Sequence, residues 1–561
     1  MAQLKLSFSK IKKFSLVLDL IFGIILLGIV LWKTDIWFET NDDHYIMDIL
    51  MGQVTGGFEY RVRVCSPIFT MPLALLYQIL PSVPWYGILM LICHLMVFML
   101  PLYFAREHVE TVIGNLLCYV VAGSLFVGSW YVQSRVQFTS TAALLATMGF
   151  FCYLMSQEKK GLIAFGAMEL TSYGMRPDAM EMIQLIGFCV LIGCLIVSGK
   201  KKKEVIHNIL YPLTVSLCII IAGIGIGKLS FWGNEWKEAE QINQARIEMM
   251  DYYGVPATEE VQDILDSYEI SGVEYEGFKH YLILDYRTMK GALNDIASYA
   301  KTNYREKISI GQIIKWVYIE SYGEAFHGLN LVELWMLIFA VGTILISKQY
   351  KKILIIFIYA FGKGIVWGYI YSQGRLVNRV VIPLYLTEIV LLLAIGISMK
   401  KEITNRILVY IYGMLLVPAC IMALLTGRSQ LRDFSVYTDS YRCLERTEQE
   451  ITEYCNQNMD KKYIVSDSLS RNWKRTVWDT SGGRDNYVYS GGWFSFAPPV
   501  QEWMDTYLDG TDLYLITTQE DVNNGNAVEH NFFSEYYGED PEQVDSIPLS
   551  TGSYALVYRV H

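Results

Sequence analysis

The sequence predicts a polytopic α-helical membrane protein that ends in a soluble α/β domain. Three observations lead to this prediction: 53% of the 561 residues are hydrophobic, the apolar residues are grouped in long blocks, and these blocks stop near residue 425. Each block has about the twenty residues that a helix needs to cross a bilayer. About eleven spans are expected, near residues 14–33, 85–104, 111–130, 137–155, 161–175, 179–198, 207–228, 331–347, 353–371, 380–398 and 406–425.

Basic residues predict the orientation of these spans, because Lys and Arg are retained on the cytoplasmic side. They occur at the N-terminus and in every second connection: Lys5, Lys10, Lys12 and Lys13, then Arg106, Lys159–Lys160, Lys200–Lys203, Lys348 with Lys351–Lys352, and Lys400–Lys401 with Arg406. The N-terminus is therefore expected inside, and the loops 34–84 and 229–330 and the tail 426–561 outside. The tail has 22 acidic against 11 basic residues, which argues against nucleic-acid binding.

The three outside segments differ in pattern. Loop 34–84 has two apolar stretches too short to span, 45–51 and 68–80, which suit helices on the membrane surface. Loop 229–330 is polar and helix-rich, with its longest periodic stretch at 236–253. The tail is expected to form a small α/β domain, separate from the membrane domain 1–425, with helices at 439–458 and 499–508 and strands at 463–466, 513–516 and 554–558.

Paired carboxylates follow the first span by a few residues, in Asn41-Asp42-Asp43-His44-Tyr45. A carboxylate at the membrane surface can take a proton from a hydroxyl or amide that attacks a lipid-borne substrate. A structural alternative is that Asn41 or Asp42 only caps a helix beginning at Asp43.

The order of these parts resembles the GT-C superfamily of integral-membrane glycosyltransferases. The resemblance is carried by the acidic motif 41–45 in the first outside loop, Ser66-Pro67, Pro81-Ser-Val-Pro-Trp85, Gly374-Arg-Leu-Val-Asn-Arg379, and the tail's Tyr489-Ser-Gly-Gly-Trp493 and Ala497-Pro-Pro499. It implies transfer of a sugar from a polyprenyl-phosphate donor to a glycan, lipid or protein acceptor, outside the cytoplasm at the plasma membrane. Many relatives have Asp-Glu where this chain has Asp42-Asp43.

The resemblance implies that Asp42 is the base and that Asp43 assists, by binding the acceptor or a divalent cation such as Mg²⁺ or Mn²⁺. Because a single inverting displacement needs only one base, the pair is not interpreted as the acid and nucleophile of a glycosidase.

A phosphate leaving group requires cationic donors beside the membrane, and guanidinium groups match its geometry. The candidates in outside connections are Arg375, Arg379, Arg176, Arg61 and Arg63. Arginines near span ends also serve as ordinary headgroup anchors, which is the structural alternative for each.

Charged residues within the spans need partners. Lys363 and Glu388 lie at similar depth in the ninth and tenth spans and are expected to pair as a structural element. The short fifth span carries Glu169 and is expected to be broken or to line a wet cavity, with Arg176 as the neighbour of this acid.

Two alternatives remain beside a glycosyltransferase. The first is a transporter or flippase of lipid-linked sugars, although such proteins are typically built from internal repeats, and no convincing repeat is present. The second is a glycan polymerase or ligase that uses a lipid-linked donor.

Overall fold

The computed structural model describes residues 15–560 except 110, 200, 281, 283–285, 305–307, 323–327, 400–405, 481–485, 509–511 and 524–527. Several of the basic residues that predict the orientation lie outside the described residues, namely Lys5, Lys10, Lys12, Lys13, Lys200, Lys400 and Lys401.

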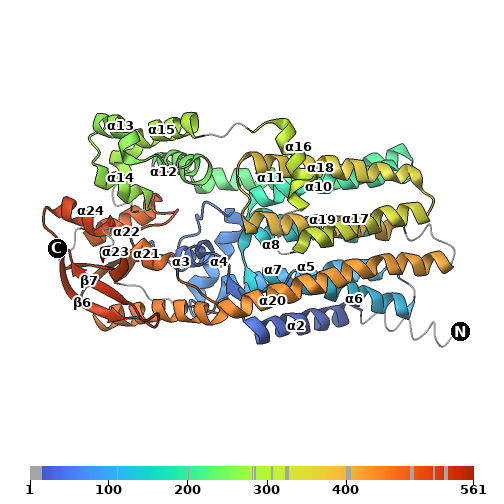
Figure 1. Cartoon of the computed structure of the whole chain (residues 1–561), viewed down its shortest axis with the longest axis horizontal. Coiled ribbons are helices and arrows are strands. Elements are labelled where there is room, and N and C mark those ends of the chain that lie inside the picture. The colour runs from blue at the N-terminus through green and yellow to red at the C-terminus, as the bar shows by residue number, and fades with distance from the viewer. Residues whose placement is uncertain are drawn as a thin grey trace.

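A bundle of long helices forms most of the chain (Figure 1). Nine of the described helices are long and apolar enough to cross a membrane: α2 (Ser15–Thr34), α5 (Trp85–Arg106), α8 (Phe138–Met155), α10 (Pro177–Ile196), α11 (Lys202–Ser230), α17 (Leu329–Ile346), α18 (Ile353–Ser372), α19 (Asn378–Met399) and α20 (Arg406–Gln457). Two further expected spans are the 17-residue helices α6 (Val112–Gly128) and α9 (Lys159–Met175). The predicted fold class is confirmed, but α9 is continuous, so the expected break in it is wrong.

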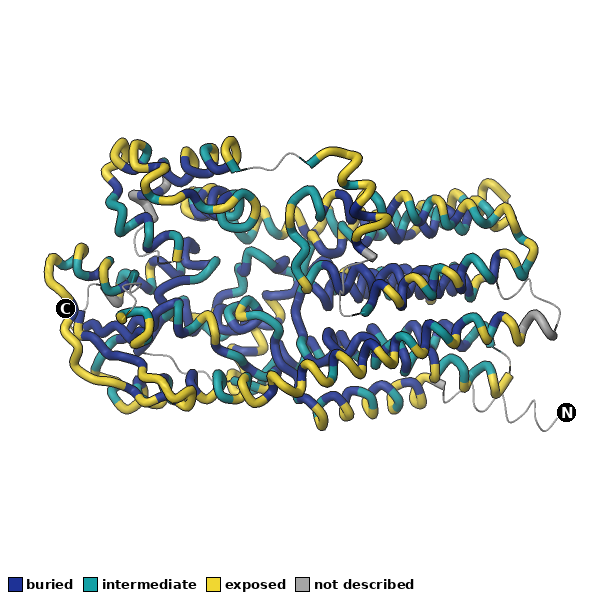
Figure 2. The backbone as a smooth tube through the Cα atoms, viewed as in Figure 1, coloured by how far each residue is buried: buried dark blue, intermediate teal, exposed yellow. Residues whose placement is uncertain are grey.

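Helices α8 and α19 occupy the centre of the bundle and are its most buried members (Figure 2). Helix α8 packs against α5, α9, α10 and α19. Both helices are apolar around most of their circumference, which is typical of a helix enclosed by others. They provide a rigid centre for the segments at their ends.

Short segments from distant parts of the chain meet at the end of the bundle next to the C-terminal sheet, which we name the domain end. They are β1 (Trp37–Phe38), α3 (Asn41–Met51), α4 (Pro67–Ile79), α7 (Trp130–Ser134) and β2 (Arg135–Val136). Strands β1 and β2 pair in parallel, and Trp37 also forms an antiparallel bridge with Thr476. The first loop is therefore fixed between the bundle and the tail.

The segment between α11 and α17 forms a helical layer beside the tail (Figure 1). Its elements are α12 (Asn234–Arg246), a π-helix (Ile247–Tyr253), α13 (Gln262–Ser267), α14 (Gly272–Lys279), α15 (Tyr286–Asn303) and α16 (Ile310–Tyr318), with 3₁₀ turns at Thr258–Glu260, Glu320–Tyr322 and, beyond α17, Tyr350–Lys352. Helix α16 lies against α18, where Trp316 stacks on Tyr371 with ring centroids 4.5 Å apart.

Helix α20 is one continuous helix of 52 residues and crosses from the bundle into the tail (Figure 1). At 1.5 Å per residue its length is about 78 Å, roughly twice the thickness of a bilayer. A span ending at 425 and a separate helix at 439–458 were expected, so the predicted boundary falls inside a helix. The two regions are joined by one continuous helix.

The tail contains a five-stranded sheet with strand order β4-β3-β5-β7-β6. Strands β3 (Lys462–Val465), β4 (Tyr487–Tyr489) and β5 (Leu513–Thr518) are parallel, whereas β7 (Tyr554–Arg559) is antiparallel to β5 and to β6 (Glu542–Pro548). The helices are α21 (Asp467–Ser470), α22 (Pro498–Leu508), α23 (Gln519–Asn523) and α24 (Val528–Tyr537). The predicted α/β domain is confirmed, with β4 and β6 as additional strands.

Candidate functional site

Asp43 lies in the first turn of α3 and is completely buried. Its Oδ1 accepts hydrogen bonds from the Tyr86 hydroxyl at 2.8 Å and from the Phe138 amide at 3.1 Å. Burial, opposed by the Tyr86 hydrogen bond, raises the pKa of Asp43 well above its usual range. The side chain thus connects α3 to α5 and to the start of α8, and it is held away from solvent.

Asp42 differs from its neighbour in exposure and in hydrogen bonding. It is partly exposed, and no hydrogen bond or ion pair to another described residue involves its carboxylate. Thr40 is the N-cap residue and the helix begins at Asn41, so the alternative that Asn41 or Asp42 is the cap is wrong. A carboxylate in the first turn is stabilised by the helix dipole. Of the two acids, Asp42 is the one that a substrate can reach.

A basic cluster surrounds Glu39, three residues before Asp42. Arg379, Arg135 and Lys474 all act electrostatically on the Glu39 carboxylate, and the Tyr131 hydroxyl donates to its Oε1 at 2.8 Å. Burial raises the pKa of Glu39 despite these partners. Burial and the nearby Arg135 together lower the pKa of Lys474, against the opposing effect of Glu39. We refer to Arg135, Arg379 and Lys474 as the basic cluster.

The guanidinium of Arg135 is held by aromatic rings. Its Cζ lies 4.4 Å from the ring centroid of Phe434 and 4.9 Å from that of Tyr131, distances at which cation–π attraction operates. Its buried Nε has no hydrogen-bond partner in the described structure. An aromatic cage fixes the position of the cation and leaves its N–H groups for an anion.

The acids and the basic cluster share one backbone framework. The Glu39 amide donates to the Val136 carbonyl at 2.9 Å, one residue beyond Arg135, and Asp43 accepts from Phe138 two residues further on. The Ser140 hydroxyl donates to the Arg379 carbonyl at 3.2 Å. The pairing of segment 39–43 with segment 135–138 therefore places Glu39 beside three cations and Asp42 three residues further along the same segment.

The five arginines predicted from sequence have different surroundings. Four contact an acid: Arg61 with Glu59 at 2.6 Å, Arg63 with Glu240, Arg176 with Asp178 at 3.0 Å, and Arg375 with Asp251 at 3.5 Å. Burial, together with the nearby Arg246, lowers the pKa of Arg63 to about 10. Only Arg379 belongs to the basic cluster, and no acid lies within ion-pair distance of it among the described residues.

Arg135 and Lys474 were not predicted. Arg135 lies in the short connection between the third and fourth expected spans, so the criterion that selected Arg375 and Arg379 could have found it. Lys474 lies in the tail, 435 positions after Glu39, and carries no local signal. Its place in the cluster depends on the bridge between Thr476 and Trp37.

The charged residues within the bundle have partners. Lys363 Nζ lies 2.9 Å from Oε2 of Glu388, and also 3.2 Å from Oε1 of Glu333 on α17, which was not predicted. Glu169 accepts a hydrogen bond from Gln184 at 2.8 Å. The expected contact of Glu169 with Arg176 is wrong, because that arginine pairs with Asp178.

The surroundings of Asp43 do not suit a divalent cation. The Asp43 oxygens face Tyr86, Phe138 and Thr40, all of which are hydrogen-bond donors. Within the described part of the chain, no three His, Cys, Asp or Glu side chains are close enough to hold a metal ion. The Asp43 oxygens are therefore occupied by hydrogen-bond donors.

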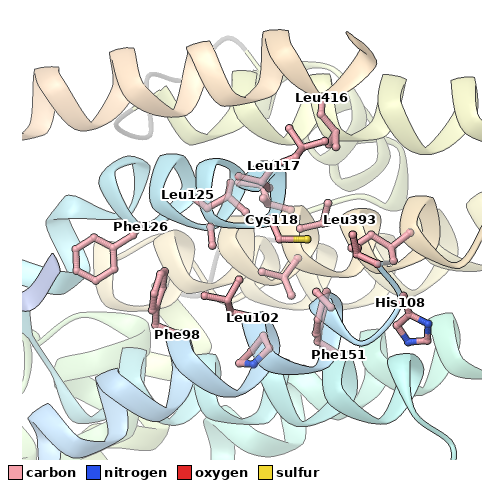
Figure 3. Close-up of a pocket in the computed structure, with 18 of the residues that line it drawn as sticks. Phe98, Leu102, His108, Leu117, Cys118, Leu125, Phe126, Phe151, Leu393 and Leu416 are labelled. Atoms are coloured by element: carbon pink, nitrogen blue, oxygen red, sulfur yellow. The ribbon is translucent and has the colours of Figure 1, made fainter. Parts of the chain in front are cut away.

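An apolar cavity of about 670 Å³ lies between α5, α6, α8, α19 and α20. Phe98, Leu102, Leu117, Phe151 and Leu393 are among the side chains that line it (Figure 3). Ser129 and Gln133 line it as well, and Gln133 lies on α7, two residues before Arg135. The polypeptide therefore passes from the wall of the cavity, at Gln133, to Arg135 on β2 within two residues.

The sequence matches no protein-family model and no curated protein. Among solved structures, the chain is similar to the crystal structure of ArnT from Cupriavidus metallidurans in the apo state, at 10% sequence identity, with 97% of each chain covered and a TM-score of 0.39. A likeness of this degree does not define the activity of the chain.

Proposed function

We propose that the protein is a membrane glycosyltransferase of the GT-C type, which transfers a sugar from a polyprenyl-phosphate donor to an acceptor. The observation that carries the proposal is the backbone pairing of segment 39–43, which carries the partly exposed Asp42, with segment 135–138 at the basic cluster around Glu39. A base on a segment that adjoins three cations suits a substitution in which a hydroxyl or amide attacks and a phosphate leaves.

The reaction proceeds in one displacement. Asp42 takes the proton of the acceptor O–H or N–H group, and the acceptor atom forms the new bond to the anomeric carbon. The bond from that carbon to the phosphate oxygen breaks, and its electron pair stays on the phosphate. Asp43 positions α3 through Tyr86 and Phe138 instead of taking the proton.

The basic cluster stabilises the charge that develops on the phosphate. Arg379 is the one predicted arginine that takes this role directly, together with Arg135 and Lys474. Arg61, Arg63, Arg176 and Arg375 are oriented by acidic neighbours, and we assign them to the periphery of the donor site.

The membrane supplies the donor. The apolar cavity, whose lining includes Gln133 two residues before Arg135, accommodates part of an isoprenoid chain whose phosphate lies at the basic cluster. The distribution of basic residues predicts that the domain end faces away from the cytoplasm, so the reaction occurs at the outer face of the plasma membrane with the tail outside.

The test is transfer of labelled sugar from a panel of polyprenyl-phosphate sugars in membranes that contain the wild type, Asp42→Asn or Asp43→Asn at matched amounts. The exposed Asp266→Asn serves as a control for the loss of one carboxylate. Donor consumption by the wild type and the control, but not by Asp42→Asn, is expected. Movement of the lipid-linked sugar across the bilayer without consumption would replace this proposal with a transporter.

A further inference from the structure

The cluster around Glu39 contains two buried polar atoms without a partner. Among the described residues, neither Oε2 of Glu39 nor Nε of Arg135 has a hydrogen-bond partner. Buried polar atoms in folded proteins are nearly always paired, and leaving one unpaired is costly. One of these atoms is an acceptor and the other a donor, and the two side chains act on each other electrostatically, so a single ligand that both donates and accepts would pair both atoms.

The charges of the cluster determine which part of the ligand lies at Oε2 of Glu39 and which part lies at Nε of Arg135. Three cations face one carboxylate, so the cluster carries a net positive charge that suits a phosphate group. Phosphate oxygens accept from Arg135, but they would repel an ionised Glu39. The group at Oε2 of Glu39 must therefore be a donor, and a hydroxyl close to the phosphate satisfies this requirement.

We infer that Glu39 is a specificity-determining residue that accepts a hydrogen bond from a hydroxyl of the sugar whose phosphate is bound by Arg135, Arg379 and Lys474. This inference rests on the proposed function, because it takes the phosphate to be that of the sugar donor. In a sugar 1-phosphate the hydroxyl nearest to the phosphate is the one on carbon 2. The site therefore selects donors that carry this hydroxyl.

Tyr131 and Asn378 support this role for Glu39. The Tyr131 hydroxyl donates to Oε1 of Glu39 at 2.8 Å, and the Asn378 amide donates to the Tyr131 oxygen at 3.4 Å. This chain of hydrogen bonds occupies one carboxylate oxygen and leaves the other for a ligand. Burial raises the pKa of Glu39, so the discrimination depends on pH and is lost when the carboxyl is protonated.

Binding to the detergent-purified full-length protein tests the inference without any turnover. The probes are glucose 1-phosphate, mannose 1-phosphate and 2-deoxyglucose 1-phosphate, with inorganic phosphate as a fourth ligand, each titrated by calorimetry. Glucose and mannose differ only in the configuration at carbon 2, so the 2-deoxy compound is the analogue of both. A hydrogen bond to a charged group predicts that the wild type binds at least one of the two hexose phosphates about tenfold more tightly than the 2-deoxy compound.

The Glu39→Gln variant is expected to bind all three sugar phosphates with similar affinity and to keep its affinity for inorganic phosphate. Glu39→Asp keeps the carboxylate and is expected to retain part of the preference. Glu107→Gln, which removes a carboxylate paired with Lys160 beyond the opposite end of α5, is the matched control and should behave as the wild type. Thermal unfolding of each variant checks that it is folded.

Equal binding of the hydroxylated and 2-deoxy compounds by the wild type would overturn the inference, as would a preference that survives in Glu39→Gln. Absence of binding by every phosphate would overturn it too. If the wild type shows the preference but never consumes a polyprenyl donor, the glycosyltransferase proposal fails and the sugar-phosphate site stands. Consumption of a polyprenyl donor by a wild type that shows no preference for the 2-hydroxyl would support the glycosyltransferase proposal and overturn the inference about Glu39.

Discussion

Arg475 of the tail and Asp48 of α3 form a fully buried ion pair, 2.7 Å from Nη1 to Oδ1. The same guanidinium contacts Glu448 on α20 and lies 3.1 Å from the Tyr489 hydroxyl on β4. One side chain therefore joins the first loop, the long helix and the sheet. Since α3 also carries Asp42, the tail is part of the framework that positions the candidate base.

Replacement of Arg475 by Ala is expected to lower the free energy of unfolding by about 3–5 kcal/mol, because it leaves two buried carboxylates without their cation. Thermal unfolding in detergent measures this loss. Arg471→Ala is the comparison, since Arg471 is half exposed and pairs with Asp467, and exposed pairs contribute about 0–1 kcal/mol. Equal stability of the two variants would contradict the role given to Arg475.

The two acids at the start of α3 are expected to respond differently to amidation. Asp42→Asn should keep the wild-type melting temperature and reduce the transfer rate by about 10²–10⁴-fold, as removal of a general base does. Asp43→Asn should instead lower the melting temperature, because it weakens the contacts with Tyr86 and Phe138. Melting curves and initial rates for both variants separate these effects, and the reverse assignment would follow if only Asp43→Asn kept its stability.

Consecutive residues on a helix point about 100° apart, so one of two neighbouring acids faces inward, but the sequence does not reveal which. The spans are predictable because a chain in lipid must satisfy its own backbone hydrogen bonds. Strands β3, β5 and β7 are predictable from their apolar residues, whereas β6 has a largely exposed surface and little hydrophobic pattern.

The parts of the site that could not be predicted depend on distant contacts. Asp48 and Arg475 are 427 positions apart, and neither has a sequence neighbour that indicates the other. Lys474 reaches Glu39 only because the tail extends the β1–β2 pair through Thr476. The continuity of α20 was missed because its sequence changes from apolar to polar near residue 425 while the backbone stays helical.

His44 predicts a dependence of stability on pH. Burial, and after it the charges of Arg475 and Lys474, lowers the pKa of His44 well below the ordinary 6.5. Below pH 6.5 the unfolded chain takes up a proton that folded His44 does not, so the free energy of unfolding falls as the pH falls, by at most about 1.4 kcal/mol per pH unit. Above pH 6.5 this contribution is constant.

His44→Gln is expected to remove this part of the pH dependence. Chemical denaturation of the wild type and the variant between pH 5 and pH 8 measures it, and the difference between the two curves cancels the carboxylates that titrate in the same range. A wild-type curve that falls toward acid no more steeply than the variant would show that His44 is not the group responsible.

Gly368 on α18 permits the close contact with α16. A Cβ at this position would lie 2.8 Å from Cγ2 of Ile313, and small residues commonly allow such an approach between helices in membranes. Gly368→Val is therefore expected to displace α16 and expose Trp316, which is buried against Tyr371. Increased quenching of tryptophan fluorescence by a water-soluble or lipid-borne quencher would report the change.

The control for Gly368→Val is Gly225→Val on α11. No heavy atom lies within 4 Å of a Cβ built at Gly225, so this variant carries the same substitution in a membrane helix without a steric conflict. Unchanged fluorescence quenching is expected for it. Similar quenching in the two variants would mean that the glycine at 368 does not hold α16 in place.

Lys363 neutralises a buried acidic pair in the bundle. Its ammonium lies between Glu388 and Glu333, and the Tyr359 hydroxyl donates to Glu333 at 2.9 Å. Lys363→Met removes the cation and leaves two carboxylates in a low-dielectric environment, which is expected to destabilise the bundle by about 3–5 kcal/mol. The melting temperature and yield of the detergent-purified protein measure this effect.

A double variant separates the loss of the charge pair from the change in side-chain shape. Lys363→Met combined with Glu388→Gln removes one acid along with the cation, so fewer unpaired charges remain and part of the lost stability should return. Glu388→Gln alone keeps Lys363 paired with Glu333 and is expected to be milder than Lys363→Met. If the double variant were less stable than Lys363→Met, packing around the side chain would outweigh the electrostatic contribution, and the pairing of Lys363 with Glu388 would not be what stabilises these helices.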